Sequence, residues 1–470
     1  MVFSSNVFLY FFLPIVLTLY YLSPKRAKTF TLFIASLVFY AWGEGALVLI
    51  MMTSAVVDYS CGLLIEKGRK KLGLFISILT NLSLLGFFKY FNFTFENFNG
   101  FISMLGYEGT YFDSLPEIAL PIGISFYTFQ TMSYTIDVYR GNVKANHNFI
   151  DFAAYVTMFP QLIAGPIVRY IDINEQLRNK KISLKNFTQG VERFIIGLAK
   201  KVIIANSFAS IADTLFAENY DTLSTPLIWL AIVSYAFQIY FDFSGYSDMA
   251  IGLGRMFGFN FLENFNYPYI SRSIKDFWRR WHISLSSWFK DYVYISVGGN
   301  RRGKLRTYFN LFLVFFVTGL WHGASWNFVV WGLFHGVFIV IERIGFDAIL
   351  NRLWRPFQHI YTLLVVLVGW MFFRVEDLQL AWYYITRMFY YTEGDAILSS
   401  SLAFFQFNRG TLFFLVLATV LSTPIYGYLN ERLSRYKIPL LRPLFIFALF
   451  LWSIIYIGSE SYNPFIYFRF

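Results

Sequence analysis

Long runs of apolar residues alternate with short polar connections along almost the whole chain. Most of these runs have about 20 residues, the length that a helix needs to cross a hydrocarbon layer of ~30 Å. We predict membrane-spanning helices at residues 6–23, 28–45, 46–65, 72–92, 118–138, 190–216, 224–243, 307–324, 326–341, 357–374, 410–429 and 441–458. The pattern is therefore typical of an all-α polytopic membrane protein.

Two further apolar segments, near residues 150–168 and 245–262, are shorter or are interrupted by proline and glycine. Irregular backbone at membrane depth is tolerated only where protein or a water-filled cavity satisfies its hydrogen bonds. We therefore expect both segments to be re-entrant or interfacial. The first apolar run begins without a Lys/Arg-rich region, which favours a retained helix over a signal peptide.

Composition agrees with a membrane protein, since 57% of the residues are hydrophobic and only 14% are charged. The net charge of +11 comes from Lys and Arg in short connections, as in cytoplasmic loops beside anionic lipid, so nucleic acid is not an expected partner. These basic clusters lie at 25–28, 67–71, 178–185, 272–306 and 432–437. Residues 90–139 contain no Lys or Arg, but they include Glu96, Glu108, Asp113 and Glu117. The positive-inside rule then predicts an extracytoplasmic amino terminus.

His322 lies within a stretch of 35 residues, Thr307 to Ile341, that contains no Asp, Glu, Lys or Arg. An ionisable side chain at that depth usually faces the interior of the helix bundle or a water-filled cavity. The predicted topology places it ~22 Å along its helix, nearer the extracytoplasmic face. Because histidine titrates close to neutral pH, this position indicates proton chemistry.

His335 follows 13 residues after His322. On one unbroken helix that spacing turns the two imidazoles to nearly opposite sides, and the glycine-rich turn at 319–323 does not separate them. We therefore expect His335 to be a structural, hydrogen-bonded residue. His147 and His359 lie near loops or helix ends, where histidine is ordinary, and we expect the same of them.

A second dense region, residues 277–304, combines Trp and Arg side chains with His282 and is too charged to span the membrane. Two interpretations are equally favoured. In one, it is an interfacial amphipathic helix in which Trp281 anchors at the headgroups and the arginines meet lipid phosphates. In the other, Arg279 and Arg280 attract a phosphate-bearing donor while His282 points toward the reaction path.

Polar side chains also gather at the end of the run at 224–243, where Gln238, Asp242 and Asp248 occur close together. Such groups are costly in a membrane unless they pair or line a cavity. The two carboxylates have no histidine at metal-ligand spacing, and the single cysteine, Cys61, cannot form a thiolate cluster. We expect hydrogen-bonded scaffolding and no metal site.

The sequence lacks the glycine-rich loops that bind nucleotides and the Gly-x-Ser-x-Gly elbow of serine hydrolases. What remains is a membrane-embedded histidine with polar neighbours and a basic cytoplasmic entrance. This combination fits a transferase that acts across the bilayer. It fits equally a proton-coupled transporter, or a polysaccharide export channel, in which His322 is a proton relay.

Four stretches of the chain resemble the membrane-bound O-acyltransferase family: 120–127, 241–252, 277–286 and 319–323. The last two contain the Trp-Arg-Arg-Trp-His and Leu-Trp-His-Gly sequences around His282 and His322. More closely, the chain resembles the membrane subunits of bacterial alginate O-acetylation, from Val2 to about residue 375. Subunits that acetylate peptidoglycan or D-alanylate teichoic acid share the histidine motifs.

The resemblance implies a ring of about 11–13 transmembrane or re-entrant helices around a thin centre, in which a cytoplasmic funnel meets an extracytoplasmic one. It implies one integral-membrane domain over residues 1–470 in the bacterial inner membrane. Within that domain we expect amino-terminal helices at 1–138, a core with both histidine motifs at 139–343, and carboxy-terminal helices at 344–470.

For the site, the resemblance implies that His322 is catalytic, either as general base on a sugar hydroxyl or as a short-lived carrier of the acetyl group, and that His282 supports it. The other expected site residues are Arg279, Arg280 and Trp281 for donor binding, and Gln238, Asp242, Ser244, Trp321 and Asn300 for lining a tunnel. We expect no bound cofactor, because the donor substrate is acetyl-CoA or an acylated carrier protein. The implied acceptor is an exported polysaccharide, alginate-like as first choice and peptidoglycan or another surface polymer as second, with a periplasmic acetyltransferase or esterase-like partner.

Overall fold

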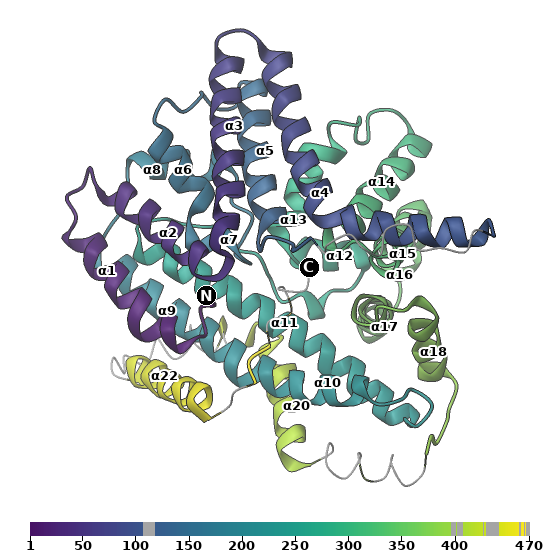
Figure 1. Cartoon of the computed structure of the whole chain (residues 1–470). Coiled ribbons are helices and arrows are strands. Elements are labelled where there is room, and N and C mark those ends of the chain that lie inside the picture. The colour runs from purple at the N-terminus through teal and green to yellow at the C-terminus, as the bar shows by residue number, and fades with distance from the viewer. Residues whose placement is uncertain are drawn as a thin grey trace. The chain divides into compact units, whose positions relative to one another are not determined.

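The computed structural model describes residues 1–106, 118–395, 401, 408–425, 427–428, 441–459, 462–464 and 466 (Figure 1). These residues form helices and connections, and no strand occurs among them. Some charged residues used above to orient the chain lie outside this description: Glu108, Asp113, Glu117, Arg432, Arg435 and Lys437.

Seven of the described helices are long and apolar enough to cross a membrane: Lys28–Glu66, Lys70–Met104, Leu184–Ala217, Thr225–Met256, Trp326–Leu350, Arg355–Arg374 and Leu441–Ser459. Shorter apolar helices at Phe8–Leu22 and Arg409–Leu421 also overlap predicted spans. The prediction of an all-α, multi-pass membrane protein is confirmed. The division of the chain at residues 138 and 343 stays a prediction.

The chain forms two compact units, and the first contains Met1–Gly190, Leu253–Leu262 and Gly323–Ser325. Its helices are α1 (Leu13–Leu22), α2 (Lys28–Glu44), α3 (Val48–Glu66), α4 (Lys70–Met104), α5 (Ile124–Arg140), α6 (Phe149–Thr157), α7 (Phe159–Leu162) and α8 (Tyr170–Arg178). The predicted break at 150–168 is present, since the backbone leaves helical geometry at Met158 between α6 and α7.

A buried polar network joins α3, α4 and α5, which lie side by side (Figure 1). Asp58 on α3 is fully buried and accepts hydrogen bonds from Ser77 Oγ and, at 2.7 Å, from Asn81 Nδ2. Asn81 Oδ1 in turn accepts from Ser54 Oγ at 3.0 Å and Thr131 Oγ1 at 3.1 Å. A buried carboxylate without such donors would be strongly destabilising, so the network fixes the register of the three helices.

The second unit contains Val191–Gly252, Glu263–His322 and Trp326–Phe470. The helices that lie in it wholly or for most of their length are α9 (Leu184–Ala199), α10 (Asn206–Ala217), α11 (Thr225–Met256), α12 (Ile274–Arg280), α13 (Ile283–Trp288), α14 (Lys304–His322), α15 (Trp326–Ile341), α16 (Asp347–Leu350), α17 (Arg355–Arg374), α18 (Leu378–Phe389), α20 (Arg409–Leu421) and α22 (Leu441–Ser459). Short π or 3₁₀ turns lie at Phe8–Phe12, Gly45–Leu47, Lys200–Ala205, Pro268–Ile270, Phe289–Tyr294 and Glu342–Phe346 across the two units.

The prediction of a separate, broken segment at 245–262 is wrong for most of its length, because α11 continues without interruption to Met256. Gly252 and Gly254, on which that prediction was based, lie within the helix. Another glycine of α11, Gly245, permits close helix packing. A Cβ atom there would lie 2.8 Å from the carbonyl oxygen of Gly197 on α9, and one on Gly197 would lie 2.5 Å from the carbonyl oxygen of Gly245. Small residues let membrane helices approach this closely.

Helices α14 and α15 pack closely, and only three residues separate them in the chain. Two glycines permit the contact. A Cβ on Gly319 would lie 2.4 Å from the carbonyl oxygen of Phe328, and one on Gly332 would lie 2.3 Å from that of Phe315. The chain therefore turns directly after His322, close to the boundary between the predicted spans 307–324 and 326–341, so the two His-Gly motifs do not lie on one unbroken helix.

Candidate active site

His322 is the last residue of α14 and is 2% exposed. Its imidazole packs edge to face against Trp331 on α15 and Phe373 on α17, with ring centroids 4.8 and 5.2 Å away. The indole of the preceding residue, Trp321, lies at 4.9 Å. The histidine predicted to be catalytic is thus held by three aromatic rings inside the second unit.

His282 lies between α12 and α13 and is completely buried. Its ring lies 4.7 Å from that of Phe243 on α11 and 6.0 Å from that of Trp321. Because the Trp321 indole also contacts His322, one aromatic side chain touches both histidines. The structure brings together the two histidine motifs, which are 40 residues apart in the sequence.

Asn264 fixes the tautomer of His282. Its Oδ1 atom accepts hydrogen bonds from the Ser284 backbone N–H at 3.1 Å and from Ser284 Oγ at 2.8 Å, and it lies 3.2 Å from His282 Nδ1. A backbone N–H can only donate, so this atom of Asn264 is the acceptor and His282 Nδ1 must carry the proton. His282 Nε2 then presents a lone pair.

That Nε2 atom is buried and has no hydrogen-bond partner among the described residues. His282 also lies outside the membrane-spanning helices. Burial lowers the pKa of the His282 imidazole from 6.5 to about 3, because the charged form is poorly solvated there. The imidazole is therefore neutral at physiological pH, and its Nε2 lone pair can accept a hydrogen bond.

The helix that leads to His282 is fixed at its other end by Glu342. The Glu342 carboxylate accepts the backbone N–H groups of Ile274 at 2.6 Å and Lys275 at 3.0 Å, at the first turn of α12. A carboxylate at this position complements the positive end of the helix dipole. Ser273 caps the same turn by accepting the N–H of Asp276.

His335 is 1% exposed, as expected for a structural residue. Its ring packs on Trp331 and on Trp278, both at 5.3 Å. The expected hydrogen bond is not seen, because Nδ1 has no partner among the described residues. Trp331 also contacts His322, so the turn between α14 and α15 brings both imidazoles onto the same indole.

The two remaining histidines lie away from this cluster. His147 pairs with Glu66 at 2.8 Å in an exposed ion pair. His359 Nδ1 lies 3.0 Å from the carbonyl oxygen of Ser271, to which it donates. Each has a local structural partner.

The three residues expected to bind the donor have different environments. Arg279 is exposed. Arg280 pairs with Asp276 at 3.1 Å and also donates to a backbone carbonyl. Trp281 is 2% exposed and packs between other rings, with Trp370 at 4.9 Å. Arg279 is thus the member of this group whose side chain is exposed and can contact a ligand.

Three of the five expected tunnel residues, Gln238, Asp242 and Ser244, are buried on α11. Gln238 Oε1 and Ser244 Oγ have no hydrogen-bond partner among the described residues, which is unusual for buried polar atoms. Trp321 contacts both histidines. Asn300 does not, because it is exposed in a turn and accepts a hydrogen bond from a tyrosine hydroxyl.

Asp242 and Asp248 on α11 are both paired, as expected of scaffolding. Asp242 forms a buried ion pair with Lys201 at 2.9 Å. Asp248 pairs with Lys200 at 2.7 Å and with Arg193 at 2.6 Å. The sequence analysis did not identify these cationic partners. A lysine inside the apolar run at 190–216 could have indicated them, because a charged residue at membrane depth usually has a buried partner.

Asn264 was also missed. It lies in a connection, 18 residues before His282, and a lone asparagine in a loop gives no sequence signal of contact with a distant histidine.

The model of the membrane-bound O-acyltransferase family matches residues 38–384. A probable alginate O-acetylase AlgI of Pseudomonas putida is 43% identical over 499 aligned positions, which cover all of both chains. The Pseudomonas aeruginosa protein of the same description is 49% identical over 395, covering 83% of this chain and 75% of its own. A peptidoglycan O-acetyltransferase of Helicobacter pylori is 37% identical over 420, covering 81% and 78%.

Proposed function

The chain belongs to the membrane-bound O-acyltransferase family, and we propose that it moves acetyl groups from a cytoplasmic donor to an exported polysaccharide, with an alginate-like polymer as the first choice. The observation that carries this proposal is the meeting of the family's two histidine motifs at Trp321. Acetylation of peptidoglycan, the activity in the name of the Helicobacter relative, is the second choice for the acceptor.

In the proposed reaction His322 is the general base. As it takes the proton of an acceptor hydroxyl, the hydroxyl oxygen forms a bond to the acetyl carbonyl carbon of a thioester donor. The bond from that carbon to the donor sulfur then breaks, and the imidazolium returns the proton to the departing thiolate. The neutral His282, oriented by Asn264, supports the step by accepting a hydrogen bond through Nε2.

The donor is proposed to approach from the cytoplasmic side, past the exposed Arg279. Acetyl-CoA and an acylated carrier protein both bring a phosphate-bearing thioester, which an exposed guanidinium attracts. Binding through such a contact weakens as ionic strength rises.

We further propose that the protein resides in the bacterial inner membrane with its amino terminus outside the cytoplasm. The basic connections support this orientation. Four of the five basic clusters lie among the described residues, and the proposed orientation puts the connections that contain them on the cytoplasmic side, where positive charge is enriched. Much of the rate enhancement would then come from positioning two substrates that occupy different compartments. In the alternative form of the proposal, the chain hands the acetyl group to a periplasmic acetyltransferase or esterase-like partner, which completes the transfer to the polymer.

Ester analysis of secreted polymer from a His322→Gln strain tests the proposal. We expect polymer to be secreted at the normal level but without acetyl esters, whereas His147→Gln, at an exposed ion pair, leaves ester content unchanged. Loss of polymer secretion in the His322→Gln strain would instead support a transporter or export channel. Normal acetylation with a folded His322→Gln protein would reduce the chain to a scaffold for other enzymes.

A further inference from the structure

The indole of Trp331 lies among the aromatic rings that surround His322. Trp331 belongs to α15 and is completely buried. Its ring centroid lies 4.8 Å from that of His322, 5.1 Å from that of Phe373 and 5.3 Å from that of His335. The side chain is therefore in direct contact with the proposed general base.

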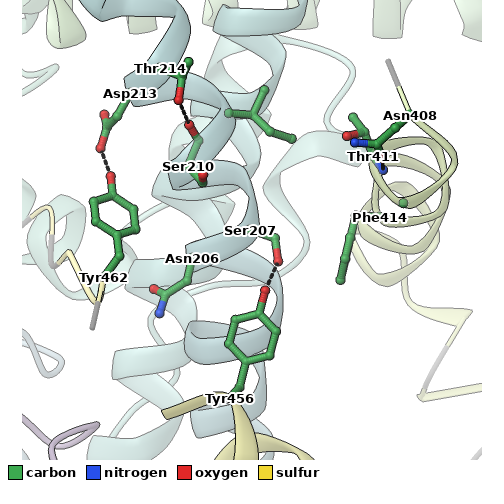
Figure 2. A pocket seen from close by; sticks show the side chains of 12 residues that line it. Asn206, Ser207, Ser210, Asp213, Thr214, Asn408, Thr411, Phe414, Tyr456 and Tyr462 are labelled. Atoms are coloured by element: carbon green, nitrogen blue, oxygen red, sulfur yellow. Dashed lines mark hydrogen bonds between the residues drawn. The ribbon is translucent and has the colours of Figure 1, made fainter. Parts of the chain in front are cut away.

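The Trp331 N–H group has no hydrogen-bond partner among the described residues. A buried tryptophan usually directs this group to an acceptor, and a buried donor without one is destabilising. In the polar cavity of about 640 Å³ between α10, α20 and α22, by contrast, several lining groups bond to each other (Figure 2). Ser207 bonds to Tyr456 there, and Asp213 accepts from Tyr462. The unpartnered donor beside His322 is thus suited to an acceptor atom that the substrate supplies.

Packing on two sides holds the Trp331 ring in place. Gly332, the next residue of α15, lets that helix approach α14, because a Cβ there would lie 2.3 Å from the Phe315 carbonyl oxygen. Toward α17, Asn327 Nδ2 donates to the Phe372 carbonyl oxygen at 3.1 Å. A donor fixed by its surroundings needs no reorganisation when charge develops beside it, which makes such donors effective in catalysis.

Acyl transfer creates one acceptor atom that gains charge during the reaction. Attack on the thioester carbonyl carbon moves the C=O π electrons onto the carbonyl oxygen, which becomes an oxyanion. The oxyanion returns to a carbonyl group when the bond from carbon to sulfur breaks and the sulfur leaves as a thiolate. The same oxyanion forms whether the attacking atom is the acceptor hydroxyl oxygen or an imidazole nitrogen of His322. An indole N–H is a neutral group that only donates, so it suits this oxygen whatever the charge of the polymer.

We propose that the Trp331 N–H donates a hydrogen bond to the carbonyl oxygen of the acetyl thioester and to the oxyanion formed from it, an inference that rests on the proposed function. In that function His322 takes the proton of the acceptor hydroxyl and returns it to the thiolate, whereas the carbonyl oxygen needs a separate donor. The contact between Trp331 and His322 brings a base and a donor to the same reacting group. Trp331 is then a catalytic residue, because its N–H touches a reacting atom.

Trp331→Phe removes the N–H and keeps an aromatic ring, and Trp278→Phe is the matched control. Trp278 is also buried, and its N–H likewise has no partner among the described residues. Its ring contacts those of Trp331 at 5.6 Å and His335 at 5.3 Å, whereas the contact with His322 belongs to Trp331. The two variants therefore lose the same group and differ in its proximity to the base.

Both variants are expressed in a strain that secretes the polymer. The rate of ester formation on that polymer is divided by the amount of folded protein from fluorescence-detected gel filtration. We expect Trp331→Phe to lower this rate ~100-fold, as loss of one oxyanion donor does, and Trp278→Phe to lower it no more than ~3-fold. Equal losses in the two variants would assign a packing role to both indoles and overturn the proposal.

A replacement of the same shape covers the case in which Trp331→Phe does not fold. Trp331→benzothienylalanine keeps the bicyclic ring and has sulfur in place of the N–H. We expect the same loss of ester formation from this variant as from Trp331→Phe. A parental rate would overturn the proposal.

A spectroscopic measurement tests the hydrogen bond itself. The probe is S-acetylpantetheine labelled with ¹³C at the carbonyl carbon, the part that acetyl-CoA and an acylated carrier protein share, and it is bound to purified His322→Gln protein. A hydrogen bond lowers the carbonyl stretching frequency, so this frequency should be higher in His322→Gln/Trp331→Phe. The double variant His322→Gln/Trp278→Phe should match His322→Gln. An unchanged frequency in the Trp331 double variant would contradict the hydrogen bond.

The His322→Gln strain separates this proposal from the proposed function. Persistent acetylation in that strain would remove the acetyltransferase assignment. Loss of acetylation in His322→Gln together with a parental rate in Trp331→Phe would leave the assignment intact and refute the donor role of Trp331.

Discussion

Asn264 Oδ1 lies 3.2 Å from His282 Nδ1 and simultaneously accepts two hydrogen bonds from Ser284. This single amide oxygen determines which imidazole nitrogen of His282 carries the proton and where the other nitrogen points. Asn264 is therefore a positioning residue, which acts on the reaction through the histidine.

Substituting Asn264 should change catalysis more than substrate binding. We expect Asn264→Leu, which removes the acceptor, to lower kcat for acetyl transfer by roughly 100-fold while KM changes little. Asn264→Asp keeps the acceptor and should recover most of the rate near and above neutral pH. Rates of purified protein in nanodiscs, in which both faces are accessible, at varied acceptor concentration separate kcat from KM, and a change confined to KM would contradict the assigned role.

A purely structural role of Asn264 would leave the pH dependence of activity unchanged, so the pH profile of Asn264→Asp tests its contact with His282. In the parent the pKa of His282 is lowered to about 3 by burial, so its protonation does not affect the rate between pH 5 and 8. A carboxylate beside the ring favours the imidazolium and raises that pKa. Activity of Asn264→Asp should therefore fall on the acid side at a higher pH than activity of the parent. Coincident profiles would count against the contact.

His335 should be dispensable for chemistry. Because it is enclosed by Trp331 and Trp278, His335→Gln should reduce stability by about 0.5–3 kcal/mol through lost packing. Acetylation per folded molecule should stay near the parental value, whereas His322→Gln abolishes it. Fluorescence-detected gel filtration after heating gives the folded fraction. A folded but inactive His335→Gln protein would show that the second imidazole takes part in the reaction.

The buried ion pair between Lys201 and Asp242 should be a stability element. Each side chain is 2% exposed, so removing one partner leaves an uncompensated charge at a cost of about 3–5 kcal/mol. We expect Asp242→Asn and Lys201→Met to lower the melting temperature strongly, and the double variant to recover much of the loss. Thermal melts in detergent check this coupling. Additive losses in the double variant would indicate that the two charges do not depend on each other.

The contact between α14 and α15 should tolerate no side chain at Gly332. An added Cβ would lie 2.3 Å from the Phe315 carbonyl oxygen, so Gly332→Ala forces the helices apart and should cost about 1–3 kcal/mol. Gly86→Ala on α4 is the control, since a Cβ there meets nothing within 4 Å and alanine favours the helix. Equal melting temperatures for the two variants would refute the close approach.

The membrane spans and the histidine motifs were predictable because they depend on local composition. A run of about 20 apolar residues identifies a span wherever it occurs. His322 stands out because the stretch from Thr307 to Ile341 around it contains no Asp, Glu, Lys or Arg. Glycine was less informative. Gly252, Gly254 and Gly258 suggested a broken segment, but α11 continues through the first two of them. Glycine also allows a continuous helix to touch a neighbour, as Gly245 does at Gly197.

Contacts between distant segments were not predictable from one sequence. Asp58 and Asn81 meet across two helices, and Asn264 reaches His282 from a separate connection. In each case the residue type is common and its spacing carries no signal, because the partner is selected by helix packing. The expected tunnel residue Asn300 illustrates the converse, since a polar residue beside a motif in the sequence lies exposed in the structure.

The backbone of His282 has φ 44° and ψ 56°, a left-handed conformation that costs a residue with a side chain roughly 1–2 kcal/mol. Asparagine and glycine adopt this conformation more readily, so the imidazole is kept at a position where another residue type would relax the chain. Replacement of His282 by glycine would relieve that strain, but it would also empty a fully buried position and leave Asn264 without its imidazole partner. The contacts of the imidazole therefore hold the backbone in a conformation that the chain would otherwise leave, so the residue proposed to support the reaction also determines how the chain passes from α12 to α13.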